Sequence, residues 1–128
     1  MDRSLDSLDP SFKPHAMALL ARLVEAEIPV LIVNTRRTAD EQAANLLKGV
    51  SWVQHSKHQD GLAIDIVPYY QFWRTGEKSL DWNPRDPLWD RIGNIGEKIG
   101  LVWGGRWAKR DLGHFEMPAH PAAAKESV

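Results

Sequence analysis

Residues 61–67 read Gly61-Leu62-Ala63-Ile64-Asp65-Ile66-Val67 and carry the clearest structural pattern in the chain. Leucine and isoleucine hold positions 62, 64 and 66, whereas small residues and Asp65 hold most of the others. Successive side chains of a β-strand point to opposite faces, so the alternation predicts a strand with its leucine and isoleucine face on the core side. Asp65 then projects from the other face, where Gly61 and Ala63 leave room beside its carboxylate.

Helices and short strands are predicted on both sides of this strand. The predicted helices run from Asp9-Pro10 to about Val24, from the N-cap Thr38 to about Leu47 with Glu41 completing a capping box, and from Asp86-Pro87 to Gly100. The predicted strands are the apolar runs Ile28–Val33, Leu101–Trp103 and Gly113–Met117. Helices packed on a small, mainly antiparallel sheet make an α+β fold.

We expect one domain over residues 5–120 and a frayed C-terminal tail over residues 121–128. The aromatic loop at residues 69–82 is long for a compact domain, and such loops usually serve function. We therefore expect it to form one wall of a groove.

The composition excludes several classes of function. The 128 residues include no cysteine, so a disulfide framework, an iron–sulfur cluster and a cysteine nucleophile are ruled out, and any metal site must use histidines and carboxylates. The net charge of -1 gives no basic footprint for nucleic acid. Without a run of about 20 apolar residues we expect no membrane insertion. The polar start at residues 1–6 is unlike a secretory signal, so we expect the protein to be cytoplasmic as synthesised. We also expect it to be a monomer.

Two segments carry the residues that could perform chemistry. His58 precedes the strand that holds Asp65, and His114 follows Asp111 and precedes Glu116. Two histidines and one aspartate are the ligand set of a catalytic zinc site with an open fourth position. The spacing leaves either Asp111 or Glu116 as the nearby base, and a His-x-Glu strand is also common as a simple surface pair.

His58 and Asp65 can share a metal only if the chain turns back between them. They lie seven positions apart, too far for one straight helix or strand. Gly61 lies between them and can adopt the backbone conformations that such a turn needs.

Four motifs, in the same order along the chain, resemble a family of zinc peptidases. This family includes D-Ala-D-Ala carboxypeptidases, VanY-type enzymes and L-alanyl-D-glutamate endolysins. Residues 56–65, Ser-Lys-His-Gln-Asp-Gly-Leu-Ala-Ile-Asp, match its signature S-x-H-x-x-G-x-A-x-D, and residues 111–114, Asp-Leu-Gly-His, match acid-x-x-His. Arg37 followed by Glu41-Gln42 resembles a third motif, and the Trp-Gly-Gly-x-Trp pattern at residues 103–107 resembles the endolysin branch.

The resemblance implies the Hedgehog/D-Ala-D-Ala zinc peptidase fold and Zn²⁺ as cofactor. It implies these roles: His58, Asp65 and His114 as metal ligands, Asp111 as catalytic acid and base, Arg37 as a catalytic polarising group, and Ser56, Gln42, Trp103 and Trp107 as substrate-binding residues. Residues 34–37, Asn-Thr-Arg-Arg, stand where the family commonly has Ser-Gly-Tyr-Arg. The five-residue step to Gln42 favours Arg37 over Arg36.

The implied function is hydrolysis of the peptidoglycan stem peptide by a zinc-dependent peptidase. The Trp-Gly-Gly-x-Trp segment favours an L-alanyl-D-glutamate endopeptidase that acts as an endolysin or cell-wall hydrolase after release from the cytoplasm. Two alternatives remain open at this point. One is a D-Ala-D-Ala carboxypeptidase or dipeptidase, and the other is a non-catalytic, zinc-stabilised module that binds the cell wall or a protein.

Overall fold

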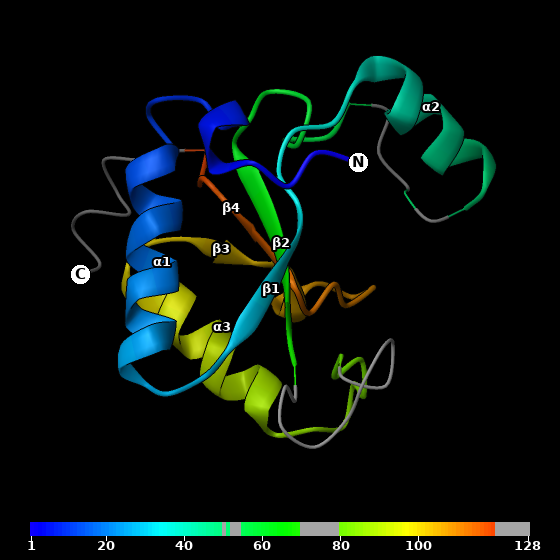
Figure 1. Ribbon diagram of the computed structural model, residues 1–128. Coiled ribbons are helices and arrows are strands. Elements are labelled where there is room, and N and C mark those ends of the chain that lie inside the picture. The colour runs from blue at the N-terminus through cyan, green and yellow to red at the C-terminus, as the bar shows by residue number, and fades with distance from the viewer. Residues whose placement is uncertain (50, 52–54, 70–79, 120–128) are drawn as a thin grey trace.

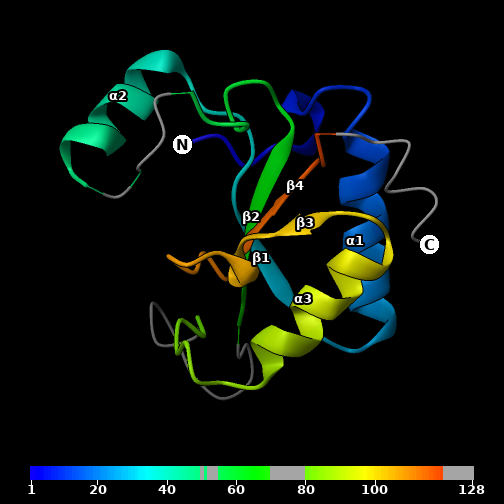
Figure 2. The same ribbon diagram turned by 180° about the vertical axis from the view of Figure 1, so that it is seen from behind.

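A computed structural model describes residues 1–49, 51, 55–69 and 80–119. In this part of the chain the elements are η1 (Leu5–Ser7), α1 (Lys13–Glu25), β1 (Val30–Asn34), α2 (Ala39–Leu47), β2 (Ala63–Pro68), α3 (Leu88–Lys98), β3 (Val102–Trp103), η3 (Gly104–Arg106) and β4 (His114–Glu116). The strands form an antiparallel sheet in the order β1-β2-β4-β3. Helices α1 and α3 pack side by side against it, whereas α2 stands apart (Figures 1 and 2). The predicted α+β fold is confirmed.

Strand β2 is the structural centre, as its alternating sequence predicts. It pairs with β1 on one side and β4 on the other. Ile64 and Ile66 are fully buried in the core that the strands form with α1 and α3. Asp65 lies on the other face, in register with His114 of β4. The core face of β2 thus fixes where the functional face points.

The first long helix starts later than its sequence signal suggests. Asp9 was the predicted N-cap, but α1 begins at Lys13 with Pro14 in its first turn. The Asp9 carboxylate instead accepts hydrogen bonds from the amide and hydroxyl of Ser11, and its carbonyl accepts from the amides of Phe12 and Lys13. The aspartate therefore caps a separate turn, and the predicted helix start is wrong by about one turn.

The other two helices have the predicted ends. The Thr38 side chain accepts from the Glu41 amide, and the Glu41 carboxylate accepts from the Thr38 amide, which completes the capping box of α2. Helix α3 ends at Lys98 with Ile99 as its C-cap, and Gly100 follows with a left-handed φ of +92°. The amide of Leu101 then reaches the carbonyl of Gly96 at 3.0 Å, as in a Schellman motif.

The packing face of α3 is made partly of glycine. Its buried residues are Trp89, Ile92, Gly93 and Gly96. A Cβ at Gly93 would fall 2.3 Å from the ring of Trp103, and one at Gly96 would fall 2.3 Å from that of Phe115. Two large rings therefore fill the space that the glycines of α3 leave open.

Two sequence predictions fall mainly on residues outside the described part. These are the tail at residues 121–128 and the aromatic loop at residues 69–82, of which 70–79 are not described. Trp82, at the end of that loop, is half exposed and stacks on Trp89 with ring centroids 6.4 Å apart. Among the described residues, no helix combines the length and apolar character needed to cross a membrane.

Candidate active site

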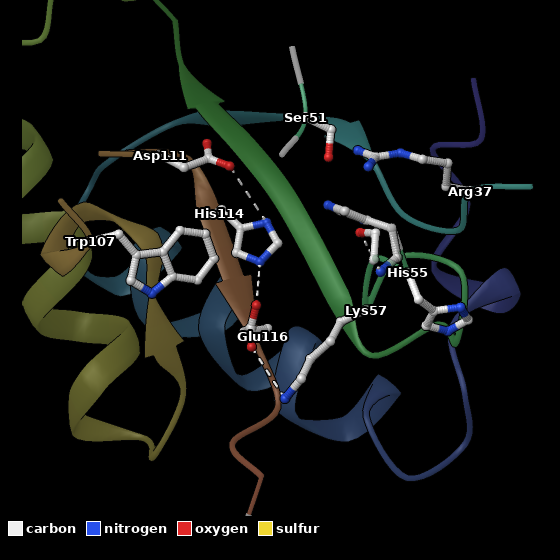
Figure 3. A pocket seen from close by; sticks show the side chains of 10 residues that line it. Arg37, Ser51, His55, Lys57, Trp107, Asp111, His114 and Glu116 are labelled. Carbon is white, nitrogen blue, oxygen red and sulfur yellow. Dashed lines mark hydrogen bonds and ion pairs between the residues drawn. The ribbon is translucent and has the colours of Figure 1, made fainter. Parts of the chain in front are cut away.

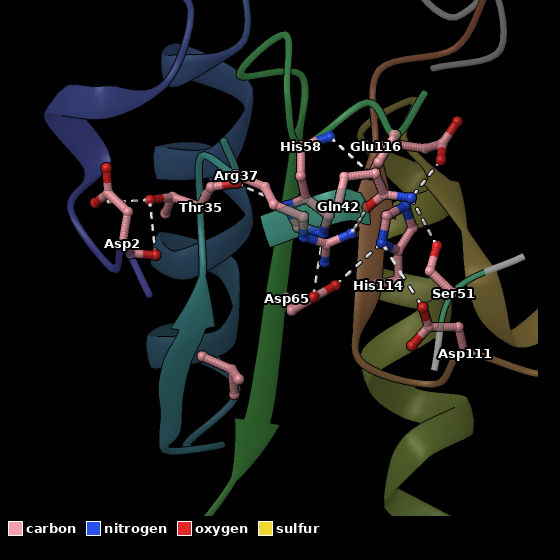
Figure 4. Close-up of polar contacts among 12 residues, drawn as sticks. Asp2, Thr35, Arg37, Gln42, Ser51, His58, Asp65, Asp111, His114 and Glu116 are labelled. Atoms are coloured by element: carbon pink, nitrogen blue, oxygen red, sulfur yellow. Dashed lines mark hydrogen bonds and ion pairs between the residues drawn. The ribbon is translucent and has the colours of Figure 1, made fainter. Parts of the chain in front are cut away.

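The structure brings together the three residues predicted to bind a metal. His58, Asp65 and His114 each offer one ligand atom, and these atoms all lie within 4.8 Å of one another. His58 Nε2 lies 3.1 Å from Asp65 Oδ2, and His114 Nδ1 lies 3.0 Å from Asp65 Oδ1 (Figure 4). Both histidines and the aspartate are largely enclosed by the protein.

A glycine turn closes the gap between His58 and Asp65. The amide of Gly61 lies 3.3 Å from the carbonyl of His58, and Gly61 has a φ of +71°. A Cβ at this position would fall 2.6 Å from the backbone nitrogen of Asp9. Both the left-handed backbone and the close approach require glycine here, as the sequence analysis expects.

The hydrogen bonds of His58 prepare one of its nitrogens for a metal. The Thr35 carbonyl, which can only accept, lies 2.6 Å from Nδ1, so Nδ1 carries the proton. Nε2 is buried and has no hydrogen bond of good geometry within the described part of the chain, although it faces Asp65. A lone pair held next to a carboxylate fits a divalent cation.

The charges of the cluster reinforce one another. Burial alone would raise the pKa of Asp65, but the hydrogen bond from His114 and the adjacent His58 imidazole hold that pKa well below its usual range. Burial alone would lower the pKa of His114, but its hydrogen bonds to Asp65 and Glu116 raise it to about 10. Asp65 is therefore ionised at neutral pH, as a metal ligand must be.

Asp111 lies on the same side of His114 as the cluster. Its Oδ2 is 3.8 Å from His114 Nδ1 (Figure 3). Partial burial, followed by the negative charge of Asp65, raises the pKa of Asp111. Glu116 instead lies against the opposite ring nitrogen, His114 Nε2, at 2.8 Å. The geometry thus favours Asp111, which the family resemblance implies as the general base, over Glu116, which the spacing alone left open.

The two neighbouring arginines have separate tasks. Arg36 donates to the carbonyls of Ser7, Gln59 and Asp60 and so ties the His58 turn to the N-terminal segment. Arg37 lines the pocket. The structure therefore supports the sequence-based choice of Arg37 as the arginine that can meet a substrate.

These residues meet in a pocket of about 380 Å³ (Figure 3). It is lined by Arg37, Ser51, His55, Ser56, Lys57, His58, Trp107, Asp111, His114 and Glu116. Ser56 and Trp107 were predicted to contact substrate and do lie here. The Trp107 ring centroid lies 5.0 Å from that of His114. Ser56 Oγ also accepts from the amide of His58 at 3.2 Å, so it supports the turn as well.

Two of the predicted substrate-binding residues, Trp103 and Gln42, are buried and are not among the residues that line the pocket. Trp103 is 1% exposed and belongs to the core, where its Nε1 donates to the carbonyl of Leu112. Gln42 is also 1% exposed. Its Oε1 accepts from Arg37 Nη1 at 2.6 Å and its Nε2 donates to Ser51 Oγ at 2.9 Å, so it positions pocket residues from behind (Figure 4).

The family motifs give no role to Ser51, His55 or Lys57. All three line the pocket. The side chain of His55 is 64% exposed and pairs with Asp60 at 2.9 Å. Lys57 could have been identified as a pocket residue from its place next to His58 in the motif. Nothing in the sequence around Ser51 identifies it as one.

Taken together, two histidines, two aspartates and an arginine around one pocket are the side chains of a metal-dependent hydrolase site. Residues 50–117 match the family described as D-alanyl-D-alanine carboxypeptidase. Over 106 residues the chain is 31% identical to the L-alanyl-D-glutamate peptidase of Listeria phage A118. The match covers 82% of this chain and 36% of the phage protein, so the chain spans about a third of that curated relative. The chain belongs to this D-alanyl-D-alanine carboxypeptidase family of peptidases.

Solved structures share the fold. The L-Ala D-Glu endopeptidase ChiX of Serratia marcescens has a TM-score of 0.68 at 20% identity, over 88% of this chain and 81% of that one. VanYB in complex with D-Alanine-D-Alanine has a TM-score of 0.61 at 14% identity, over 93% of this chain and 75% of that one. A VanY variant in complex with Zn(II) has a TM-score of 0.60 at 17% identity, over 93% and 76%. The fold expected from the sequence resemblance is confirmed.

Proposed function

We propose that this protein is a zinc-dependent peptidoglycan peptidase that hydrolyses the L-alanyl-D-glutamate bond of the stem peptide. The observation that carries the proposal is the convergence of His58, Asp65 and His114 with Asp111 and Arg37 at one pocket. The choice of bond is supported by the phage relative, whose name states that activity.

The residues of the cluster fit zinc in number and kind. Two imidazoles and one carboxylate are a ligand set of catalytic zinc sites, and His58 Nε2 and His114 Nδ1 both face Asp65. Bound there, zinc would supply a water of lowered pKa and polarise the scissile carbonyl.

Asp111 and Arg37 would perform the remaining chemistry. Asp111 takes a proton from the attacking water and returns it to the leaving amine, and its raised pKa brings it closer to the value that both steps need. The Arg37 guanidinium stabilises the negative charge that develops on the carbonyl oxygen. Gln42 holds that guanidinium from the protein side. Trp107 offers an apolar surface for the peptide.

The proposal is tested by digestion of purified peptidoglycan, with and without a chelator, and mass spectrometry of the products. We expect new D-glutamate amino termini that disappear on chelation and return with added zinc. Release of free D-alanine or its dipeptide would instead favour the carboxypeptidase alternative, which the family description and the VanYB complex suggest. Stoichiometric zinc without any cleavage would replace the peptidase with a zinc-stabilised binding module.

A further inference from the structure

Both ring nitrogens of His114 are engaged, and by different carboxylates. Nδ1 lies 3.0 Å from Asp65 Oδ1 in the metal cluster, whereas Nε2 lies 2.8 Å from Glu116 Oε1 outside it. A carboxylate oxygen accepts hydrogen bonds, and the 2.8 Å separation places Glu116 Oε1 as the acceptor for Nε2. Glu116 therefore keeps a proton on Nε2 and leaves Nδ1 as the nitrogen that can bind a metal.

The strand pairing gives Glu116 its place. Glu116 of β4 lies opposite Ala63 of β2, two positions from the pair His114 and Asp65. Opposed residues of adjacent strands share a face of the sheet, so Glu116 and His114 lie on the same face. The small side chain of Ala63 leaves room for the larger carboxylate beside it.

Lys57 holds Glu116 from the other metal-bearing segment. Its Nζ lies 3.2 Å from Glu116 Oε2 and donates to the carbonyl of Met117 at 2.5 Å (Figure 3). The Glu116 side chain is only 15% exposed, so this ion pair is shielded from solvent on most sides. Because Lys57 directly precedes His58, the ion pair links the turn that carries one histidine to the strand that carries the other.

We propose that Glu116, held by Lys57, is a positioning residue that selects Nδ1 of His114 as a metal ligand. Glu116 does for His114 what the Thr35 carbonyl does for His58. Both of its oxygens are engaged on the far side of the ring, by His114 and by Lys57, so it is not the general base. This inference rests on the proposed zinc site and adds the residue that fixes its second histidine.

The test measures zinc affinity directly, by competition with a chromophoric chelator. It compares two substitutions of similar volume at Glu116 with one substitution at Lys57. Glu116→Leu removes the acceptor, and we expect zinc affinity about 10–100-fold weaker, the usual cost of losing such a partner. Glu116→Gln keeps an oxygen that can accept from Nε2, so we expect its affinity to stay within a few-fold of the parent. Lys57→Met leaves the acceptor but releases it, and we expect an intermediate loss. Glu25→Gln, at an exposed ion pair with Arg22 on α1, is the matched control and should bind zinc unchanged.

Long-range ¹⁵N–¹H NMR of the histidine rings in the zinc-free protein, recorded at alkaline pH where the His114 ring is neutral, reads the proton position itself. We expect the His114 proton on Nε2 in the parent and in Glu116→Gln, and a mixture of ring forms in Glu116→Leu. Parent-like zinc affinity and an unchanged proton position in Glu116→Leu would overturn this inference and leave the proposed zinc peptidase standing. Failure of the parent protein to bind zinc would overturn both.

Discussion

The two sides of the pocket are built in different ways. On one side, Asp65 and His114 face each other from paired strands, and the backbone ladder of β2 and β4 sets their separation. On the other side, Arg37 and Ser51 lie on the segments before and after α2. Of the α2 residues, all of them described, Gln42 alone is buried. The metal side is thus fixed by the sheet, and the opposite side by a small set of polar contacts.

This difference follows from what each side has to do. Ligand atoms must lie within a few tenths of an ångström of the ideal distance to a metal, so rigid strands suit them. An arginine that meets a carbonyl oxygen or a carboxylate needs orientation, which one good side-chain partner can give. Substitutions on the metal side should therefore remove zinc, whereas substitutions on the opposite side should lower the catalytic rate with zinc still bound.

The largest expected effect comes from breaking the metal side. Replacement of His114 by Ala removes one ligand and the strand-to-strand contact with Asp65. We expect loss of stoichiometric zinc and of all measurable peptidoglycan hydrolysis, checked by metal analysis of the purified variant and by product mass spectrometry. Retention of full activity in the zinc-free variant would contradict the site as described.

Loss of the general base should separate chemistry from metal binding. We expect Asp111→Asn to lower kcat by about 10²–10⁴-fold, because proton transfer by a positioned side chain contributes that much. Zinc content should stay at the parent level. A variant with parent kcat would show that another group moves the proton.

The arginine pair tests the opposite side of the pocket. Arg37→Ala should lower kcat/KM by about 10²–10³-fold with zinc still bound, because it removes a donor aimed at developing negative charge. Arg36→Ala is the matched control. Its three contacts are all to backbone carbonyls, so we expect a loss of about 1 kcal/mol in the free energy of unfolding and little change in kcat. Similar kinetic losses in both variants would erase the distinction between them.

The smallest effect expected is a pH dependence confined to the metal side. The pKa of His114 is raised to about 10 from its usual 6.5, so the zinc-free protein keeps that proton at neutral pH. Zinc must displace it, and zinc affinity should therefore rise by up to about tenfold per pH unit below pH 10. Isothermal titration calorimetry in buffers of different ionisation enthalpy should record this proton release. In Arg37→Ala the same pH dependence should persist.

Local signals predicted most of the elements, because the physics behind them is local. The capping box of Thr38 and Glu41 and the glycine end of α3 each depend on a few neighbouring residues, and both occur as predicted. The alternation around Asp65 correctly predicts the strand and the burial of Ile64 and Ile66, although Ala63 and Val67 on the face of Asp65 are buried as well. The four motifs identified the candidate metal ligands. These ligands meet in the fold because the chain turns back at Gly61.

The sequence could not predict the placement of residues whose burial depends on tertiary packing. Trp103 and Trp107 are the same residue type four positions apart, yet Trp103 is buried against Gly93 of α3 and Trp107 lines the pocket. Nothing in their immediate sequence separates them. Gln42 sits in a motif with Arg37, but only the folded chain shows that it contacts the arginine and leaves the pocket to it. A residue's place in a motif thus predicts that it belongs to the site, but it does not predict whether the residue contacts substrate or supports a neighbouring side chain.

Zinc bound at the proposed site would also stabilise the correct register of β2 against β4. Asp65 and His114 are opposed residues of neighbouring strands, separated by 49 positions in the chain. A slip of one residue would turn His114 to the other face of the sheet and separate it from Asp65 and His58. Because only the correct alignment can form the complete ligand set, the free energy of zinc binding is added to that alignment alone, and misaligned strand pairings gain nothing from the ion.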